Sequence, residues 1–286
     1  MPFAVVKLVR DERDDFFESM IRIKYILFLM VPFLLLYSCE KVIDVDLNEA
    51  DPAVVIEGNL SYLEGELEVN ISKTGSYFGT QPSEKVENAE VFLETATGLR
   101  INIEEKGQGV YKRKRLQVFP GETYRLTATV GETQYTAVST LYERVQIDSL
   151  GYKYYGKNRF FDGGYHILLY FSDPPDQKNY FRVRIFKNEK LLNETSDIVV
   201  FDDSGLEGKG IQVRLQGQTF KAGDTARVEM LAIDENAWEY FTTFREMANI
   251  NPGSPAPANP VSNFSNGALG YFSAWSHDTK SIVIEP

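Results

Sequence analysis

The residue types that most often carry chemistry are scarce in this chain. Its 286 residues contain one cysteine, Cys39, and two histidines, His166 and His277. A single thiol excludes a disulfide framework within the chain and a cluster of thiolate metal ligands. A thiolate can still act as a nucleophile or carry a lipid, and its sequence context decides between these roles. The flanks of Cys39 therefore hold most of the chemical information.

An apolar run with a short basic flank precedes this cysteine. Arg22 and Lys24 are followed by Tyr25–Tyr37, which is uncharged, almost wholly apolar and interrupted by Pro32. As a helix this run reaches about 20 Å, which is short of the bilayer's hydrocarbon core of about 30 Å. The pattern predicts a signal peptide over residues 20–38 and not a transmembrane helix.

The run ends in Leu36-Tyr37-Ser38-Cys39, which resembles the lipobox of bacterial lipoproteins. This resemblance implies cleavage between Ser38 and Cys39, diacylation of the thiol with chains such as palmitate, and acylation of the new amine. Two or more acyl chains hold a protein on a bilayer, whereas one chain binds only marginally. We therefore expect Cys39 to be the site of lipid attachment. The alternative is a buried structural cysteine that happens to follow an apolar run.

The segments on either side of the signal peptide are acidic. Residues 1–19 place five carboxylates ahead of the basic pair, so we interpret Met20 as the start of translation and residues 1–19 as an upstream extension. Residues 39–52 are expected to form an acylated tether. Their acids loosely resemble surface-export signals of Bacteroidota lipoproteins, and a plain solvated linker explains them equally well. The outer membrane is the expected location, with the surface and the periplasmic face both left open.

Apolar and polar residues alternate with period two from Ala53 onward, with Gly- and Pro-containing turns between short runs. This spacing predicts an all-β fold with two β-sandwich domains, residues 53–146 and residues 147–286. One amphipathic helix is expected at residues 234–249, with Asp234 as its N-cap and Trp238, Phe241 and Phe244 on its packed side. The last two strands are expected near residues 268–275 and 281–285, after a proline-rich loop at residues 251–263.

The composition limits the class of partner. Apolar residues make up 43% of the chain, which is ordinary globular composition, and the net charge is −11. An acidic, exported chain is a poor nucleic-acid binder, because such proteins present a basic face.

Short motifs spread over the whole mature chain resemble a known family. They are Cys39–Asp44, Val54–Gly58, Ile71–Thr74, Gly109–Tyr111, Pro120–Leu126, Asp148–Leu150, Asp173–Pro175, Asn179–Arg182, Gly223–Thr225 and Ala268–Ser273. Their order and spacing are similar to the Bacteroidota lipoproteins of domain-of-unknown-function family 4249. The resemblance implies two β-rich domains, the first immunoglobulin-like, and genes that often lie beside TonB-dependent outer-membrane receptors. It supplies no catalytic or ligand-binding residues.

One aromatic segment is the predicted contact surface. It comprises Tyr152, Tyr154, Tyr155, Phe160, Phe161 and Tyr165. Aromatic side chains with polar rims bind sugars and peptides by stacking and by displacing water. The alternative is that half of these rings fill the sandwich core. The proline loop Pro252–Pro260 is the second expected contact.

Three other groups favour structural roles. The basic run Lys112–Arg115 lies in an expected edge strand, where positive charge protects against edge-to-edge association. His166 and His277 lack the spacing of metal ligands, and no metal is expected. The pairs Asp173/Asp176 and Asp202/Asp203 could bind calcium or do acid–base work, but their Pro and Gly neighbours favour turns.

Motifs for nucleophilic, metallohydrolase and phosphate-binding sites are missing from the sequence, so neither an enzyme nor a cofactor is expected. The favoured interpretation is a non-enzymatic outer-membrane lipoprotein that acts as an accessory or ligand-capture partner of a TonB-dependent receptor. A structural or adhesive surface module without a transport role is the alternative, and a hydrolase comes third.

Overall fold

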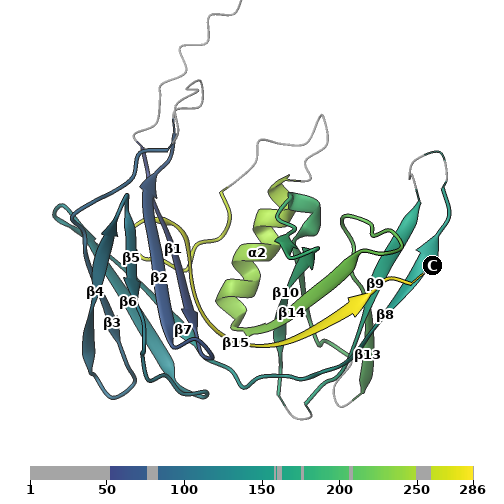
Figure 1. Ribbon diagram of the computed structural model, residues 1–286. Helices are drawn as coiled ribbons and strands as arrows, with labels where there is room; N and C mark the ends of the chain where they lie inside the picture. The colour runs from purple at the N-terminus through teal and green to yellow at the C-terminus, as the bar shows by residue number, and fades with distance from the viewer. Residues whose placement is uncertain are drawn as a thin grey trace, which may run out of the picture. The chain divides into compact units, whose positions relative to one another are not determined.

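The computed structural model describes residues 52–75, 83–157, 159, 163–174, 177–205, 209–248 and 259–285 (Figure 1). Cys39, the signal peptide and all but Pro52 of the expected tether lie outside these residues, so the lipid attachment site stays a prediction.

Strands of the first half build two hydrogen-bonded layers around one core. Their bounds are β1 Val54–Ser61, β2 Glu66–Lys73, β3 Glu90–Glu94, β4 Arg100–Gly107, β5 Val110–Arg113, β6 Thr123–Val130 and β7 Thr133–Thr140. The order along one layer is β1-β2-β5-β4, and β4 continues through β3 and β6 to β7 in the other. Strand β4 serves both layers because Arg100–Ile103 pair with β3 and Glu104–Gly107 pair with β5.

Alternation along these strands produces the core. In β2, Leu67, Val69 and Ile71 are fully buried, while the residues between them keep partial exposure. Tyr111 and Tyr124 are buried in the same core, and each hydroxyl bonds to a loop. Tyr111 donates to the carbonyl of Val86, and Tyr124 donates to Glu122. The period-two pattern of the sequence therefore corresponds to the buried positions of these strands.

The second half places a three-stranded sheet against a second group of strands. The smaller sheet has the order β13-β9-β8. The bounds are β8 Ile147–Tyr155, β9 Gly164–Ser172, β10 Tyr180–Lys187, β11 Lys190–Leu191, β12 Val199–Asp202, β13 Gly210–Arg214, β14 Thr225–Ile233 and β15 Leu269–Val283, with a 3₁₀ turn, η1, at Thr195–Asp197. Phe181, Val183 and Ile185 of β10 pack toward β9, and they form the second core with residues of β14 such as Val228.

The C-terminal strand differs from the sequence-based expectation. Instead of two strands near residues 268–275 and 281–285, the chain forms one strand, β15. Its first half pairs in parallel with β1 and its second half pairs antiparallel with β14. Phe272 and Ala274 accordingly belong to the core of the first sandwich. The residues Glu49–Pro286 form one compact unit, and the expected boundary at residue 146 remains a prediction.

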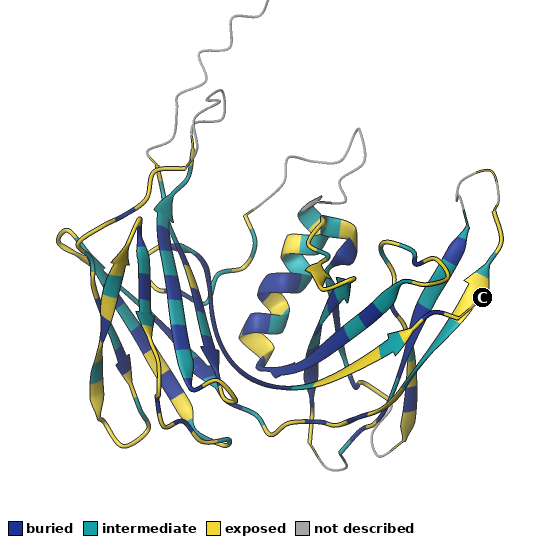
Figure 2. Ribbon diagram, in the orientation of Figure 1, coloured by how far each residue is buried: buried dark blue, intermediate teal, exposed yellow. Residues whose placement is uncertain are grey.

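Helix α2, Glu235–Ala248, confirms the predicted helix (Figure 1). Leu231 and Ile233 of β14 face it, on the side of the sheet opposite the second core. Buried and exposed residues alternate along the helix (Figure 2). Phe241 is buried as expected, but Tyr240 is also buried, whereas Phe244 is 38% exposed.

The fold class is thus all-β and sandwich-like with one α-helix among the described residues, as the sequence predicts. In the same part of the chain, no helix has the length and apolarity to cross a membrane.

Candidate functional site

The structure divides the predicted aromatic segment between two faces of the β8–β9 hairpin. Tyr165 of β9 makes edge contacts with Tyr152 and Tyr154 of β8, at centroid distances of 5.6 and 5.2 Å. Tyr152 and Tyr165 pack against the second core, while Tyr154 is 57% exposed. Some of these rings therefore fill the core and one lies at the surface, and the contact role of the segment stays a prediction.

Tyr155 points to the opposite face of the hairpin, as strand alternation requires. Its ring contacts His166 edge-on at 5.0 Å, and the Arg214 guanidinium lies 5.1 Å from the ring centroid. The Nδ1 atom of His166 also lies 3.4 Å from the carbonyl oxygen of Leu215. Phe160, Phe161 and most of the proline loop lie outside the described residues.

The basic run does not lie on an edge strand, contrary to the prediction. Strand β5 contains Lys112 and Arg113 and runs between β2 and β4. The Lys112 Nζ lies 2.7 Å from Glu68, Lys114 lies 3.1 Å from Glu66, and Arg113 lies 3.4 Å from Glu104. Lys112, Arg113 and Lys114 therefore bind neighbouring carboxylates, which reduces the positive charge that the run offers to an anion.

The predicted carboxylate pairs are rearranged. Asp176 is outside the described residues, and Asp173 instead comes together with Asp203 around Asn179. The Asn179 backbone N–H donates to Asp203 Oδ2 at 2.6 Å, and its side-chain amide donates to Asp173 at 3.3 Å. Asp202 accepts a hydrogen bond from Ser204 at 2.7 Å. This geometry holds two loops together, and the described residues contain no group of three or more metal-ligating side chains.

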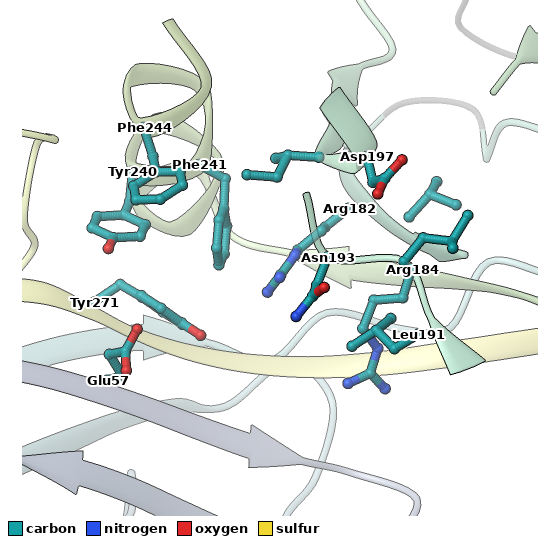
Figure 3. Close-up of a pocket in the computed structure, with 13 residues that line it drawn as sticks. Glu57, Arg182, Arg184, Leu191, Asn193, Asp197, Tyr240, Phe241, Phe244 and Tyr271 are labelled. Carbon is teal, nitrogen blue, oxygen red and sulfur yellow. The ribbon is translucent and has the colours of Figure 1, made fainter. Parts of the chain in front are cut away.

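A pocket beneath α2 forms a candidate site that sequence reasoning did not find (Figure 3). Its volume is about 220 Å³. The residues that shape it are Glu57, Arg182, Arg184, Asn193, Asp197, Tyr240, Phe241, Phe244 and Tyr271. They come from β1, β10, the segment after β11, η1, α2 and β15, so the pocket depends on distant parts of the sequence.

Strand alternation explains why two arginines face this pocket. Because Phe181, Val183 and Ile185 of β10 enter the second core, Arg182 and Arg184 face the side that α2 covers. Both guanidinium groups stack on aromatic rings. Arg182 lies 3.8 Å from the centroid of Phe241, and Arg184 lies 4.9 Å from that of Trp275.

The two arginines differ in their cross-strand partners. Arg184 is paired in register with Glu229 of β14, and their charged groups are 2.6 Å apart. Arg182 is in register with Leu231 of β14 and Val200 of β12, neither of which carries a charge. No carboxylate of the described chain forms an ion pair with Arg182 within 4.0 Å. Burial lowers the pKa of Arg182, and the Tyr271 hydroxyl opposes this effect in part.

Aromatic rings form the other wall of the pocket. Tyr271 lies 4.8 Å from Tyr240 and 4.7 Å from Phe241, measured between ring centroids. Burial and the nearby Glu57 raise the pKa of Tyr240, so this hydroxyl stays protonated at neutral pH. The Tyr271 hydroxyl donates to Asn59 of β1 at 3.2 Å, which fixes its ring.

Two acids also line the pocket. Asp197 is buried, and its oxygens accept hydrogen bonds from the backbone N–H groups of Gln218 and Glu194 at 3.1 and 3.0 Å. Glu57 is exposed on β1. In Figure 3 the Arg182 side chain extends beside the Phe241 ring, while Glu57 lies on the β1 side of the pocket. The arrangement offers a cation, aromatic walls and hydroxyl groups, which together suit binding of a small ligand.

Comparison with known proteins identifies the family. The profile of the "Domain of unknown function (DUF4249)" matches residues 40–281. The chain belongs to the DUF4249 family. No curated protein matches this sequence.

Solved structures give low similarity to this DUF4249 chain. A two-domain fibronectin type III segment of chicken tenascin has a TM-score of 0.24 and 10% identity, covering 82% of this chain and 99% of that one. The chicken interferon gamma receptor alpha chain has a TM-score of 0.22 and 9% identity, covering 83% of this chain and 99% of that one.

One sequence signal could have pointed to the pocket of this DUF4249 protein. In Tyr180–Phe186, arginines occupy two alternate positions of an otherwise apolar run. Such a strand predicts one face in a core and one face under a second layer with a polar function. The identity of that layer, α2, and the absence of an acid opposite Arg182 depend on long-range pairing and could not be read locally.

Proposed function

We propose that this DUF4249 protein is a non-enzymatic, lipid-anchored protein of the outer membrane that captures a ligand as the accessory partner of a TonB-dependent receptor. The pocket beneath α2 carries the ligand-binding part of this proposal, because a stacked guanidinium and aromatic walls are features of a binding site. The lipobox ending at Cys39 supports the anchor. Support for the receptor comes from the family resemblance, which implies neighbouring receptor genes.

Anchoring makes such a partnership physically reasonable. A protein confined to the plane of the membrane meets a membrane receptor at high effective concentration, so a modest intrinsic affinity is sufficient. The described residues offer two β-layered regions with ample surface for an interface of about 800 Å² per partner. Tyr154 is the best candidate contact in the aromatic segment, because 57% of it is exposed on a rigid hairpin.

A pull-down in mild detergent from the native membrane tests the proposal. We expect the tagged wild-type protein to bring down a TonB-dependent receptor, and Tyr154→Ala to weaken this capture without lowering the melting temperature. Phe119→Ala is the matched control, because Phe119 is an aromatic residue of the first sandwich with a similar exposure of 56%.

Recovery of the protein alone, in conditions that preserve other receptor–lipoprotein pairs, would overturn the receptor part of the proposal. It would favour the structural or adhesive surface module. Equal loss of capture in Tyr154→Ala and Phe119→Ala would exclude Tyr154 as a specific contact.

A further inference from the structure

We infer that the pocket beneath α2 binds a carboxylate group attached to an aromatic or other flat apolar body, with Arg182 as the residue that binds the carboxylate. This inference deepens the proposed function. It rests on that proposal only for the role of the ligand as the molecule that is handed to the receptor. The binding itself is a property of this chain alone.

The first step of the argument is the uncompensated charge of Arg182. Arg182 is half-buried, and cations that lose much of their water are normally paired, because an unpaired charge in a medium of low polarity is costly. Arg184, two residues along the same strand face, follows this rule through Glu229 at 2.6 Å. Arg182 has Leu231 in the equivalent place. Its favourable contacts are the Phe241 ring at 3.8 Å and the hydroxyl of Tyr271, neither of which neutralises a charge.

The second step is the chemistry that a guanidinium selects. Its planar fork of N–H donors matches the two oxygens of a carboxylate, so a bidentate pair forms with defined geometry. The Phe241 ring and the Tyr271 hydroxyl cannot engage all the N–H donors of Arg182, so donors remain to meet a ligand. The two acids of the pocket do not fill this role, since neither Glu57 nor Asp197 is within ion-pair distance of Arg182 in the described chain.

The third step is the shape of the remaining walls. Tyr240, Phe241 and Tyr271 pack at centroid distances of 4.7 to 5.2 Å and expose ring faces and edges to the pocket. Phe244 lies at the mouth with 38% of its surface exposed, which leaves a ring available for stacking. A volume of about 220 Å³ is below the range of about 300–1,000 Å³ that is usual for drug-sized ligands. The pocket therefore suits a small acid or the acidic end of a longer molecule.

The net charge of the chain makes the binding of a carboxylate at Arg182 more selective. At −11 the protein repels anions at long range, so a carboxylate gains affinity only where a specific cation is within a few ångströms. In the low-polarity surroundings of α2, the attraction between Arg182 and a carboxylate is stronger than at an open surface.

Matched acid and amide probes test the inference on the detergent-solubilised full protein. The small probes are benzoate with benzamide, and N-acetylphenylalanine with its amide. A tetrapeptide that ends in phenylalanine, with a free or an amidated C-terminus, is the longer probe. Ligand-detected NMR against protein-free micelles gives the affinities. We expect the affinity for each acid to exceed the affinity for its amide by about tenfold or more, because a hydrogen bond to a charged group is lost in the amide.

Variants locate the effect. Arg182→Met keeps an unbranched apolar side chain over Phe241 and should abolish the preference for the acid. Arg100→Met is the matched control, because Arg100 also lies 3.8 Å from an aromatic centroid, that of Phe92, but lines no part of this pocket. Phe244→Ala should weaken acid and amide alike without changing the melting temperature, and this readout remains available if Arg182→Met does not fold.

Each outcome decides the inference. Equal binding of acid and amide, no binding of any probe, or an unchanged preference in Arg182→Met would overturn it. A preference that is seen with the tetrapeptide alone assigns the carboxylate to a chain end, and one seen with the small probes assigns it to a free acid. The measurement needs no receptor, so its failure is distinct from a failed pull-down.

Discussion

At the scale of single residues, Asp234 shows how one buried carboxylate serves two parts of the chain. Its Oδ1 accepts the backbone N–H of Ala237 at 2.9 Å and so caps α2. Its Oδ2 accepts the backbone N–H of Thr140 at 3.0 Å, at the end of β7. The sequence predicted the first contact from the Asp234 position before the helix. The second contact joins residues 94 positions apart and left no local signal.

Removing this carboxylate should destabilise the protein. We expect Asp234→Ala to lower the free energy of unfolding by at least the 0.5–2 kcal/mol or so that an N-cap contributes. The unpaired N–H of Thr140 adds to this loss, because a buried donor without a partner is costly.

The pH dependence of the same site distinguishes its charge from its hydrogen bonds. Burial raises the pKa of Asp234 above its ordinary value of 3.8. The folded protein then holds this proton more tightly than the unfolded chain, so the stability from Asp234 is greatest below pH 3.8 and is lost as the pH rises through the raised pKa. Asp234→Asn keeps the cap and has no such titration. Urea unfolding should show the variant gaining stability relative to wild type from acid to neutral pH, and a constant difference would contradict this.

At the scale of elements, β15 connects the two cores. Its first half runs beside β1. The first core is completed from the end of the sequence by four side chains, those of Phe264, Ala268, Phe272 and Ala274. Close packing makes the contact specific. Gly270 has a φ of +97°, and a Cβ there would clash with the backbone of Ile56. Hydrogen bonds extend the contact to β7, since the Ala274 N–H donates to the Ser139 hydroxyl at 2.8 Å.

This connection predicts that the first sandwich does not fold from its own segment. A fragment of residues 53–146 lacks the β15 partner of β1 and four core side chains, so it should show no cooperative thermal transition. The same fragment joined to residues 259–275 by a glycine-rich linker should regain the transition. Circular dichroism on both fragments tests this, and cooperative melting of residues 53–146 alone would be the contrary result.

At the scale of the whole molecule, the sequence predicted what local patterns determine. Period-two alternation located the strands of both halves, and the spacing of Trp238 and Phe241 located α2. Alternation does not specify which strands become neighbours, so β5 was wrongly placed at an edge and β15 was divided into two strands. The pocket was missed for the same reason. It needs Arg182, Tyr240 and Tyr271 together, and these residues meet only through the pairing of β10, β14 and β15.

The last prediction concerns the anchor, on which the whole molecule's proposed role depends. Cys39→Ser removes the thiol that we propose takes the lipid, so metabolic labelling with a fatty acid should mark the wild type and not the variant. Without acyl chains the protein should leave the outer-membrane fraction, because those chains are its proposed anchor. Its capture by the receptor should then fall, since the gain from confinement to the membrane plane is lost while the interface is unchanged. Ser38→Ala is the matched control, because a small residue is kept before the cysteine and labelling should persist. A Cys39→Ser protein that still carries label and stays in the outer membrane would show that the lipid is attached elsewhere.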